Sequence, residues 1–392
     1  MSNHQKVYNQ LIQLSKEVSL LGSCESLLSW DQEVYMPPKG TEHRAAQTTL
    51  LSGIIHERFT SHAMGEWLSE CEASDFMSDP LSDEAVNIRE IRRAYDRKVK
   101  LPKSLVEEIA HTTTLAHAAW VKARAKSNFA TFQPWLEKIV ELKRQEADCY
   151  GFEKVRYDAL LDEYEPGETT ENLTGLFSGL QEELSPLVRQ IKDSPKQPDS
   201  SILHREYPSD RQKVFAEMAA AAIGFDFSAG RLDEVVHPFC SGIGPGDTRI
   251  TTRYNPRFFN EAFFGVLHEA GHGLYDQGLE SEHYGTPRGK FVSLGIHESQ
   301  SRLWENFVGR SFAFWEHFFP KAQGIFHAAL ADVSLDDFVH AINEVRPSFI
   351  RVEADEATYN LHIILRFELE QAIVADDLEV ADIPDAWNRR FK

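Results

Sequence analysis

Residues 267–275, which read LHEAGHGLY, constrain the fold of this chain more than any other stretch. They contain His268, Glu269 and His272 in the order H-E-x-x-H. Residues four apart lie on one face of an α-helix, about one turn from each other, so both imidazoles can face one metal ion. Glu269 lies beside that face, where it can accept a proton from a water molecule. The spacing therefore predicts a helix with a zinc-type hydrolytic site, against the alternative of a surface helix with two unrelated histidines.

The residues around the motif favour a buried helix. Asn260 is the predicted N-cap, an apolar run follows it, and Gly278 is the predicted end of the helix. Gly265, Gly271 and Gly273 lie within the helix, where each costs about 1 kcal/mol relative to alanine. We therefore expect another backbone or a ligand to come close to this helix.

A site with two histidines needs a third ligand, and Glu298 is the candidate. It follows His272 by 26 residues, at the predicted first turn of a new helix that starts near residue 297. Two histidines and one glutamate leave a fourth position open for water, as in catalytic metal sites. The neighbouring His297 fits two interpretations equally, a hydrogen bond near the metal or a cap of that helix.

The composition excludes several classes of protein. Lysine and arginine number 41 and aspartate and glutamate 61, a net charge of -20, which argues against nucleic acid and anionic membranes as partners. We find neither a signal peptide nor an apolar run long enough to span a bilayer, and we expect a cytoplasmic protein. The four cysteines form no C-x-x-C pair, which is typical of reduced thiols.

Helical periodicity dominates the amino-terminal part of the chain. It predicts one catalytic domain with a helical lobe over about residues 1–230 and a metal-site lobe over about 231–392. The clearest periodic segments are residues 11–21, 105–125, 135–150 and 173–191. The aromatic residues between 304 and 319 are interpreted as core packing.

Residues 247–254 alternate with period two and predict a single strand just before the metal helix. Arg249, Thr251 and Arg253 would share one face of this strand. Two interpretations stay open. The strand pairs with an extended peptide by edge addition, or it is an edge strand kept soluble by its arginines.

Four motifs in order resemble those of the carboxypeptidase Taq family of zinc metallocarboxypeptidases. They are D-x-R-x-T at 247–251, H-E-x-x-H at 268–272, H-E-S-Q at 297–300 and I-R-x-x-A-D at 350–355. Residues 30–38 also resemble the amino-terminal region of the family, so the likeness covers nearly the whole chain.

The resemblance implies a mainly α, two-lobed metallopeptidase with a deep cleft and a small antiparallel β-sheet beside the H-E-x-x-H helix. It implies a homodimer that releases single residues from the carboxyl ends of peptide substrates. Carried over by motif, His268, His272 and Glu298 become ligands of Zn²⁺, or of Co²⁺ or another divalent ion, and Glu269 becomes the general base. Arg249 and Arg351 become candidate substrate contacts.

Several points stay open at this level. Arg351 equally fits an ion pair with Asp355, four residues further along an expected helix. The family continues beyond the equivalent of Lys392 into a segment with a G-x-x-Q-D-x-H-W motif, whose histidine is expected near the substrate carbonyl. The alternatives are therefore a metallo-endopeptidase or oligopeptidase, and a shortened, catalytically weak relative that binds peptides. Tyr254, Tyr284 and Tyr359 are the first candidates for a donor to the oxyanion.

Overall fold

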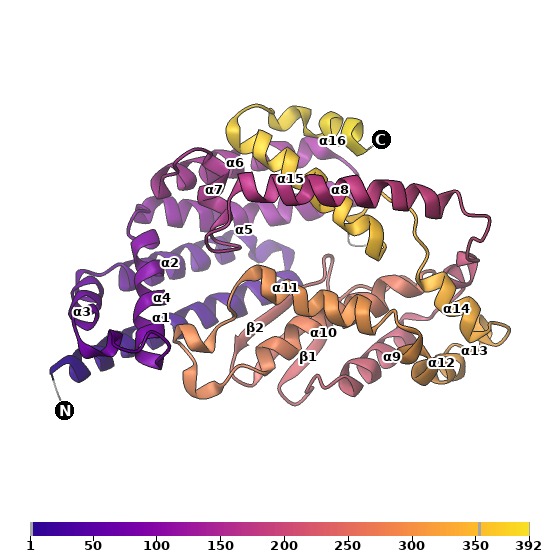
Figure 1. Cartoon of the computed structure of the whole chain (residues 1–392), viewed down its shortest axis with the longest axis horizontal. Coiled ribbons are helices and arrows are strands. Elements are labelled where there is room, and N and C mark those ends of the chain that lie inside the picture. Colours follow the sequence, from indigo (N-terminus) through magenta and orange to yellow (C-terminus); the bar gives the residue numbers. More distant parts are fainter. Residues whose placement is uncertain (1–2, 352–353, 392) are drawn as a thin grey trace. The chain divides into compact units, whose positions relative to one another are not determined.

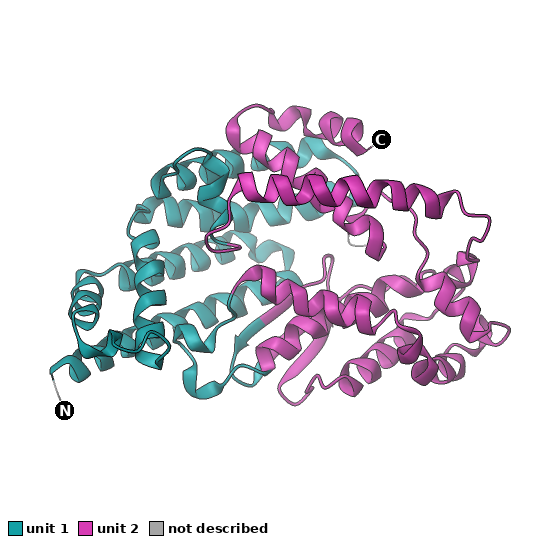
Figure 2. Ribbon diagram, viewed as in Figure 1, with its two compact units in different colours: residues 1–163, 242–247, 278–292 teal, residues 164–241, 248–277, 293–392 magenta. Residues whose placement is uncertain are grey.

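The computed structural model describes residues 3–351 and 354–391 (Figure 1). The chain divides into two compact units, coloured separately in Figure 2. Unit 1 comprises residues 1–163, 242–247 and 278–292, and unit 2 comprises residues 164–241, 248–277 and 293–392. The predicted lobe boundary near residue 230 is not among the points at which the chain passes from one unit to the other.

Unit 1 is built from helices that bury apolar faces against one another. Ser61 and Ser82 cap two of these helices, and each side-chain oxygen accepts a hydrogen bond from a backbone N–H of the first turn. Leu11, Met64 and Ile88 are fully buried at the centre of one of its clusters. The helices are α1 (Asn3–Val34), α2 (Thr41–Phe59), α3 (His62–Glu72), α4 (Asp83–Lys98), α5 (Lys103–Ala125), α6 (Phe129–Tyr150) and α7 (Arg156–Leu161).

Unit 2 combines helices with most of a small sheet, of which residues 242–247 belong to unit 1. Its main core is aromatic, and Trp315, Phe215 and Phe259 are among its most buried members. The helices are α8 (Thr170–Lys192), α9 (Ser209–Ala222), α10 (Phe259–Gln277), α11 (Leu294–Arg302), α12 (Phe312–Ile325), α13 (His327–Leu330), α14 (Leu335–Ile342), α15 (Glu356–Ala375) and α16 (Ile383–Phe391). A π-helical turn, Leu303–Val308, continues directly from α11.

The prediction of a mainly helical fold is confirmed, and α1, α5, α6 and α8 cover the segments with helical periodicity. The aromatic segment is only partly core. Trp315, Phe318 and Phe319 are buried, but the side chains of Phe307 and Phe312 are exposed. No helix within the described ranges is long and apolar enough to cross a membrane.

The sheet differs from the prediction in strand number and direction. It has the strands β1 (Gly230–Glu234), β2 (Cys240–Gly244) and β3 (Asp247–Thr252) in the order β1-β3-β2. Strand β1 pairs with β3 in parallel, with Gly230 opposite Thr248 and Glu234 opposite Thr252, so the expected antiparallel sheet is in fact mixed. The prediction missed β1 because its charged residues and glycine lack the β-branched enrichment that marks a strand.

Strand β3 is the central strand, which excludes both interpretations of it as an edge strand. Thr248, Ile250 and Thr252 are buried, and the strand ends before Arg253. The Oγ1 atom of Thr252 donates a 3.4 Å hydrogen bond to the carbonyl of Ala262 in α10. One face of the sheet therefore supports the helix that contains the H-E-x-x-H motif.

Helix α10 begins at Phe259, two residues before Glu261, the predicted first residue. Asn260 lies inside the helix rather than at its cap, whereas the helix ends at Gln277, just before Gly278 as predicted. Phe259, at the first position, lies in the aromatic core and stacks on Phe263 with ring centroids 5.3 Å apart. Burial of this apolar first turn stabilises the start of the helix.

Candidate metal centre

Helix α10 presents His268 and His272 on one face. Their ring centroids lie 5.1 Å apart. Both side chains are largely buried, with 19% and 14% of their surface exposed. The predicted pairing of these two imidazoles is therefore present in the fold.

Helix α11 brings Glu298 to the two histidines. Its Oε2 atom lies 3.2 Å from Nε2 of His272 and 3.6 Å from Nε2 of His268. The helix begins at Leu294, where the Oγ atom of Ser293 accepts a hydrogen bond from the N–H of Ile296. Glu298 therefore lies in the second turn and not the first, and the cap is Ser293 rather than His297.

The three side chains fit a divalent metal ion. Their ligand atoms, two imidazole nitrogens and one carboxylate oxygen, all lie within 4.8 Å of one another. Two histidines and a glutamate form the ligand set of catalytic zinc sites with an open fourth position. The chemistry of the donors and their convergence on one point support the assignment of His268, His272 and Glu298 to the metal.

A glycine allows α10 and α11 to approach closely. A Cβ atom on Gly271 would lie 2.6 Å from both the carbonyl oxygen of Gln300 and the Cα atom of Ser301. Such contacts are too short for any side chain, so only glycine permits this packing. The predicted close approach of a backbone is thus found at Gly271, where α11 packs on α10. Figure 1 shows these two helices as neighbours.

The electrostatics of the ligand side chains follow from burial and pairing. Burial by itself lowers the pKa of His268, but the hydrogen bond to Glu305 and the surrounding carboxylates raise it to about 9. Burial acts to raise the pKa of Glu298, but its hydrogen bond with His272 and the nearby His268 bring it down to about 2. Glu298 is therefore a carboxylate at neutral pH, as a metal ligand must be.

Glu269 is buried and has an environment suited to proton transfer. Its side chain contributes to the wall of a cavity of about 180 Å³, next to His268. Burial raises the pKa of Glu269 to about 7. A general base works best when its pKa lies near the working pH. The structure therefore gives Glu269 the environment that its predicted role requires.

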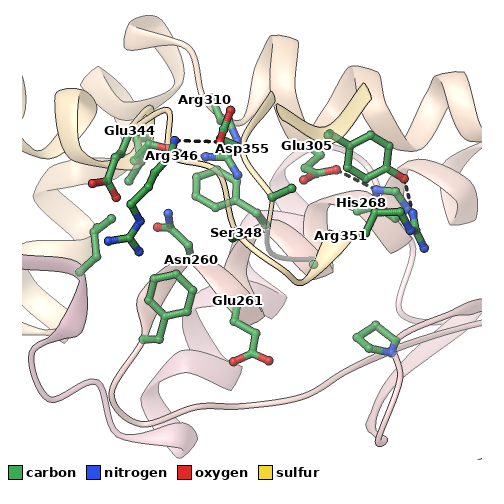
Figure 3. Close-up of a pocket in the computed structure, with 18 of the residues that line it drawn as sticks. Asn260, Glu261, His268, Glu305, Arg310, Glu344, Arg346, Ser348, Arg351 and Asp355 are labelled. Carbon is green, nitrogen blue, oxygen red and sulfur yellow. Dashed lines mark hydrogen bonds and ion pairs between the residues drawn. The ribbon is translucent and has the colours of Figure 1, made fainter. Parts of the chain in front are cut away.

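The same cavity in unit 2 is lined by several arginines (Figure 3). Arg253 pairs with Glu261, and Arg310 donates to the carbonyl of Ile342. Arg346 and Arg351 form no ion pair with any described carboxylate. Figure 3 shows Arg351 on the side of the cavity that holds His268, and Arg346 on the other side.

The alternative ion pair between Arg351 and Asp355 is not formed. Asp355 caps α15, and its Oδ1 atom accepts hydrogen bonds from the N–H groups of Ala357 and Thr358. Arg351 precedes that helix and donates from Nη1 to the hydroxyl of Tyr359. The expected helix through Arg351 and Asp355 is wrong because the chain enters α15 only after this cap.

Arg249 and His297 lie outside the cavity wall. Arg249 lies on β3 and is not among the residues that line the cavity. His297 does not cap α11, whose cap is Ser293, but it forms a hydrogen bond beside the candidate ligands. Its Nε2 atom forms a 3.0 Å hydrogen bond with Asp276, and its ring stacks on His272 at a centroid distance of 4.5 Å. His297 thus supports a ligand ring from the side.

Sequence reasoning missed Glu305, which contacts one of the two ring nitrogens of His268. Its Oε2 atom lies 2.8 Å from Nδ1 of His268 (Figure 3). Nε2, the other nitrogen of that ring, lies 3.6 Å from Glu298. Histidine ligands are commonly oriented by a carboxylate in this way. Glu305 follows Glu298 by seven residues, the spacing of one helix face, and that spacing is the signal that could have found it.

Among the three tyrosines proposed as oxyanion donors, Tyr359 alone lines the cavity. Its hydroxyl lies 3.3 Å from Oε1 of Glu298. Tyr284 belongs to unit 1 and donates to the carbonyl of Ser19. The hydroxyl of Tyr254 is buried without a hydrogen-bond partner among the described residues.

Comparison with known proteins finds one family over most of the chain. The family described as Carboxypeptidase Taq (M32) metallopeptidase matches residues 10–392. Thermostable carboxypeptidase 1 of Thermus thermophilus is 49% identical over 397 residues, covering 98% of this chain and 77% of that protein. Carboxypeptidase 1 of Bacillus subtilis is 40% identical over 384 residues, covering 98% and 76%. The chain thus spans about three quarters of the length of these curated relatives.

Solved structures agree with the sequence comparison. The structure titled "BsuCP Crystal Structure" superposes with a TM-score of 0.95 at 39% identity and covers 98% of this chain and 77% of that one. The M32 carboxypeptidase from Deinococcus radiodurans R1 superposes with a TM-score of 0.88 at 37% identity, with the same coverage.

Proposed function

Because the chain belongs to the carboxypeptidase Taq (M32) metallopeptidase family, we propose that it releases single residues from peptide carboxyl ends with a zinc ion held by His268, His272 and Glu298. The convergence of these three ligands beside a cavity that also contains Glu269 is the observation that carries the proposal. A bound zinc ion supplies a Lewis acid and lowers the pKa of the water it polarises to about 7. Co²⁺ or another divalent ion fits the same donor set.

Glu269 is the proposed general base. Its carboxylate accepts a proton from the attacking water, and the resulting acid can protonate the departing amine. Burial supports both steps, because a carboxyl with a pKa of about 7 is readily protonated and deprotonated near neutrality. The same burial excludes bulk water from the proton that is transferred.

Arg351 is the proposed contact for the free carboxylate of the substrate. A guanidinium binds a carboxylate through two parallel hydrogen bonds. Arg351 lines the cavity near His268 and has no carboxylate partner among the described side chains, so its charge remains for the substrate. Arg249, on β3, lies outside the lining and is the weaker candidate. We propose no direct carboxylate contact for it.

The proposal is tested by the products of a peptide with a free carboxyl end and of its carboxyl-terminal amide. Mass spectrometry over time is expected to show the free peptide shortened one residue at a time, with the amide intact. A chelator should stop the reaction, and added Zn²⁺ or Co²⁺ should restore it. Internal cleavage of both peptides would instead indicate an endopeptidase or oligopeptidase. Tight binding of the free peptide without products would indicate a catalytically weak relative.

Assembly and location are part of the same proposal. We propose a homodimer, as the family resemblance implies, and light scattering of the purified chain measures its mass directly. We further propose a cytoplasmic location. Cys24, Cys71, Cys149 and Cys240 are all free, as is usual for proteins of a reducing compartment.

A further inference from the structure

The hydroxyl of Tyr359 lies between a metal ligand and the substrate cavity. We propose that Tyr359 is a positioning residue that holds Glu298 in place and links it to Arg351. This inference rests on the proposed function, because it concerns the same metal site. The role differs from that of an oxyanion donor, since the phenol proton is directed at a ligand carboxylate rather than at a substrate.

The direction of the hydrogen bonds follows from the chemistry of the three groups. An arginine guanidinium has only donors, so the Tyr359 oxygen must accept the hydrogen bond from Nη1 of Arg351. The single phenolic proton is then left for Oε1 of Glu298, 3.3 Å away. A carboxylate at this position can only accept. Arg351 therefore fixes the orientation in which Tyr359 donates to Glu298.

This hydrogen bond constrains the torsion that decides which oxygen of Glu298 faces the histidines. The terminal carboxylate torsion of glutamate is broad and has no single preferred value. Tyr359 holds Oε1. The Ser301 hydroxyl lies 3.0 Å from Oε2 but 2.6 Å from the backbone carbonyl of Glu298, to which its one proton is donated. With Oε1 held, Oε2 remains directed at Nε2 of His272 and His268. The side chain of Glu298 is 40% exposed, so surrounding packing alone does not fix it.

The ring of Tyr359 is itself held in place. The residue lies in the first turn of α15, is only 8% exposed, and follows the Asp355 cap. The guanidinium of Arg302 lies 3.7 Å from the ring centroid. Arg302 also pairs with Glu305 at 3.5 Å, and Glu305 orients His268. The supports of His268 and Glu298 are therefore connected through Arg302 and the Tyr359 ring.

The test compares metal affinity in four variants, measured by competition with a chromophoric chelator for Zn²⁺. Tyr359→Phe keeps the ring beneath Arg302 and removes only the hydroxyl. We therefore expect metal affinity to fall about 10-fold, which is typical when a hydrogen bond to a metal ligand is removed. Arg351→Met should weaken metal binding several-fold in the parent chain. In the Tyr359→Phe background it should have no further effect. Arg346→Met is the matched control, because it removes an arginine from the other side of the cavity and should leave metal affinity unchanged.

Two results would overturn the inference. Parent-like metal affinity of Tyr359→Phe would remove Tyr359 as a support of Glu298. An equal effect of Arg351→Met in both backgrounds would break the link between Arg351 and the ligand. Thermal unfolding of the metal-free proteins verifies that Tyr359→Phe is folded. If Tyr359→Phe is unfolded, the test rests on Arg351→Met alone. Unchanged metal affinity in that variant then overturns the inference. Failure of the proposed function gives a different result, because a variant with His272 replaced would then still bind the metal ion.

Discussion

Replacement of Glu269 by glutamine is expected to lower kcat about 100- to 10,000-fold while the metal content stays at about one ion per chain. The amide keeps the shape of the side chain but cannot accept a proton. Glu269 is not among the three converging ligands, so its replacement leaves the donor set intact. Loss of turnover without loss of metal separates a general base from a ligand.

The measurement pairs kcat on a blocked dipeptide with elemental analysis of the same samples. Glu344→Gln is the matched control, because Glu344 is another carboxylate of the cavity wall and its Oε1 atom accepts only from Ser200 among the described hydrogen bonds. We expect its kcat to stay within a few-fold of the parent value. Near-normal turnover of Glu269→Gln would remove Glu269 from the mechanism.

Replacement of His272 by alanine is expected to abolish stable metal binding and, with it, activity. His268 and Glu298 alone cannot close a catalytic site, which needs three protein ligands. The loss of metal affinity should exceed the roughly 10- to 100-fold loss that follows removal of a residue hydrogen-bonded to a metal ligand. Chelator competition with Zn²⁺ measures this affinity without any substrate.

His283→Ala is the control for that experiment. His283 forms a second cluster with Glu280 and Glu282 whose ligand atoms also lie close enough for a cation, but the cluster belongs to unit 1 and is largely exposed. This variant should bind one metal ion as the parent does. Retention of metal by His272→Ala together with its loss in His283→Ala would move the metal site to the other cluster.

The candidate metal ligands could be predicted from the sequence because their geometry is local. The spacing of His268 and His272 fixes their shared face once the segment is helical, and that requires no knowledge of the rest of the chain. Glu298 required more, namely a second helix packed against the first. Gly271 marked that contact, because a glycine costs stability within a helix unless close packing requires it.

The sheet could not be predicted to the same degree. A parallel pair joins segments that are distant in sequence, and strand β1 lacks a strong pattern of its own. The period-two alternation of β3 was visible, but its central place depends on both neighbours. Alternation indicates that a segment is a strand and does not identify the segments that pair with it.

The supports of the metal ligands were missed or misassigned for a similar reason. Tyr359 is one of three tyrosines that the sequence offers as oxyanion donors, but its hydroxyl bonds to Glu298, 61 residues away. A helical ion pair with Asp355 is one of the two interpretations that the sequence allows for Arg351, but Asp355 starts that helix as its cap. Hydrogen bonds between distant segments depend on packing that local patterns do not encode.

The most direct test of the metal site is the position of the ion in a crystal of the zinc-loaded protein. Diffraction recorded on both sides of the zinc absorption edge locates the ion independently of any activity. We expect one strong anomalous peak within bonding distance, about 2.0–2.2 Å, of Nε2 of His268, Nε2 of His272 and Oε2 of Glu298. A strong peak at Glu280, Glu282 and His283, with none beside His272, would contradict it.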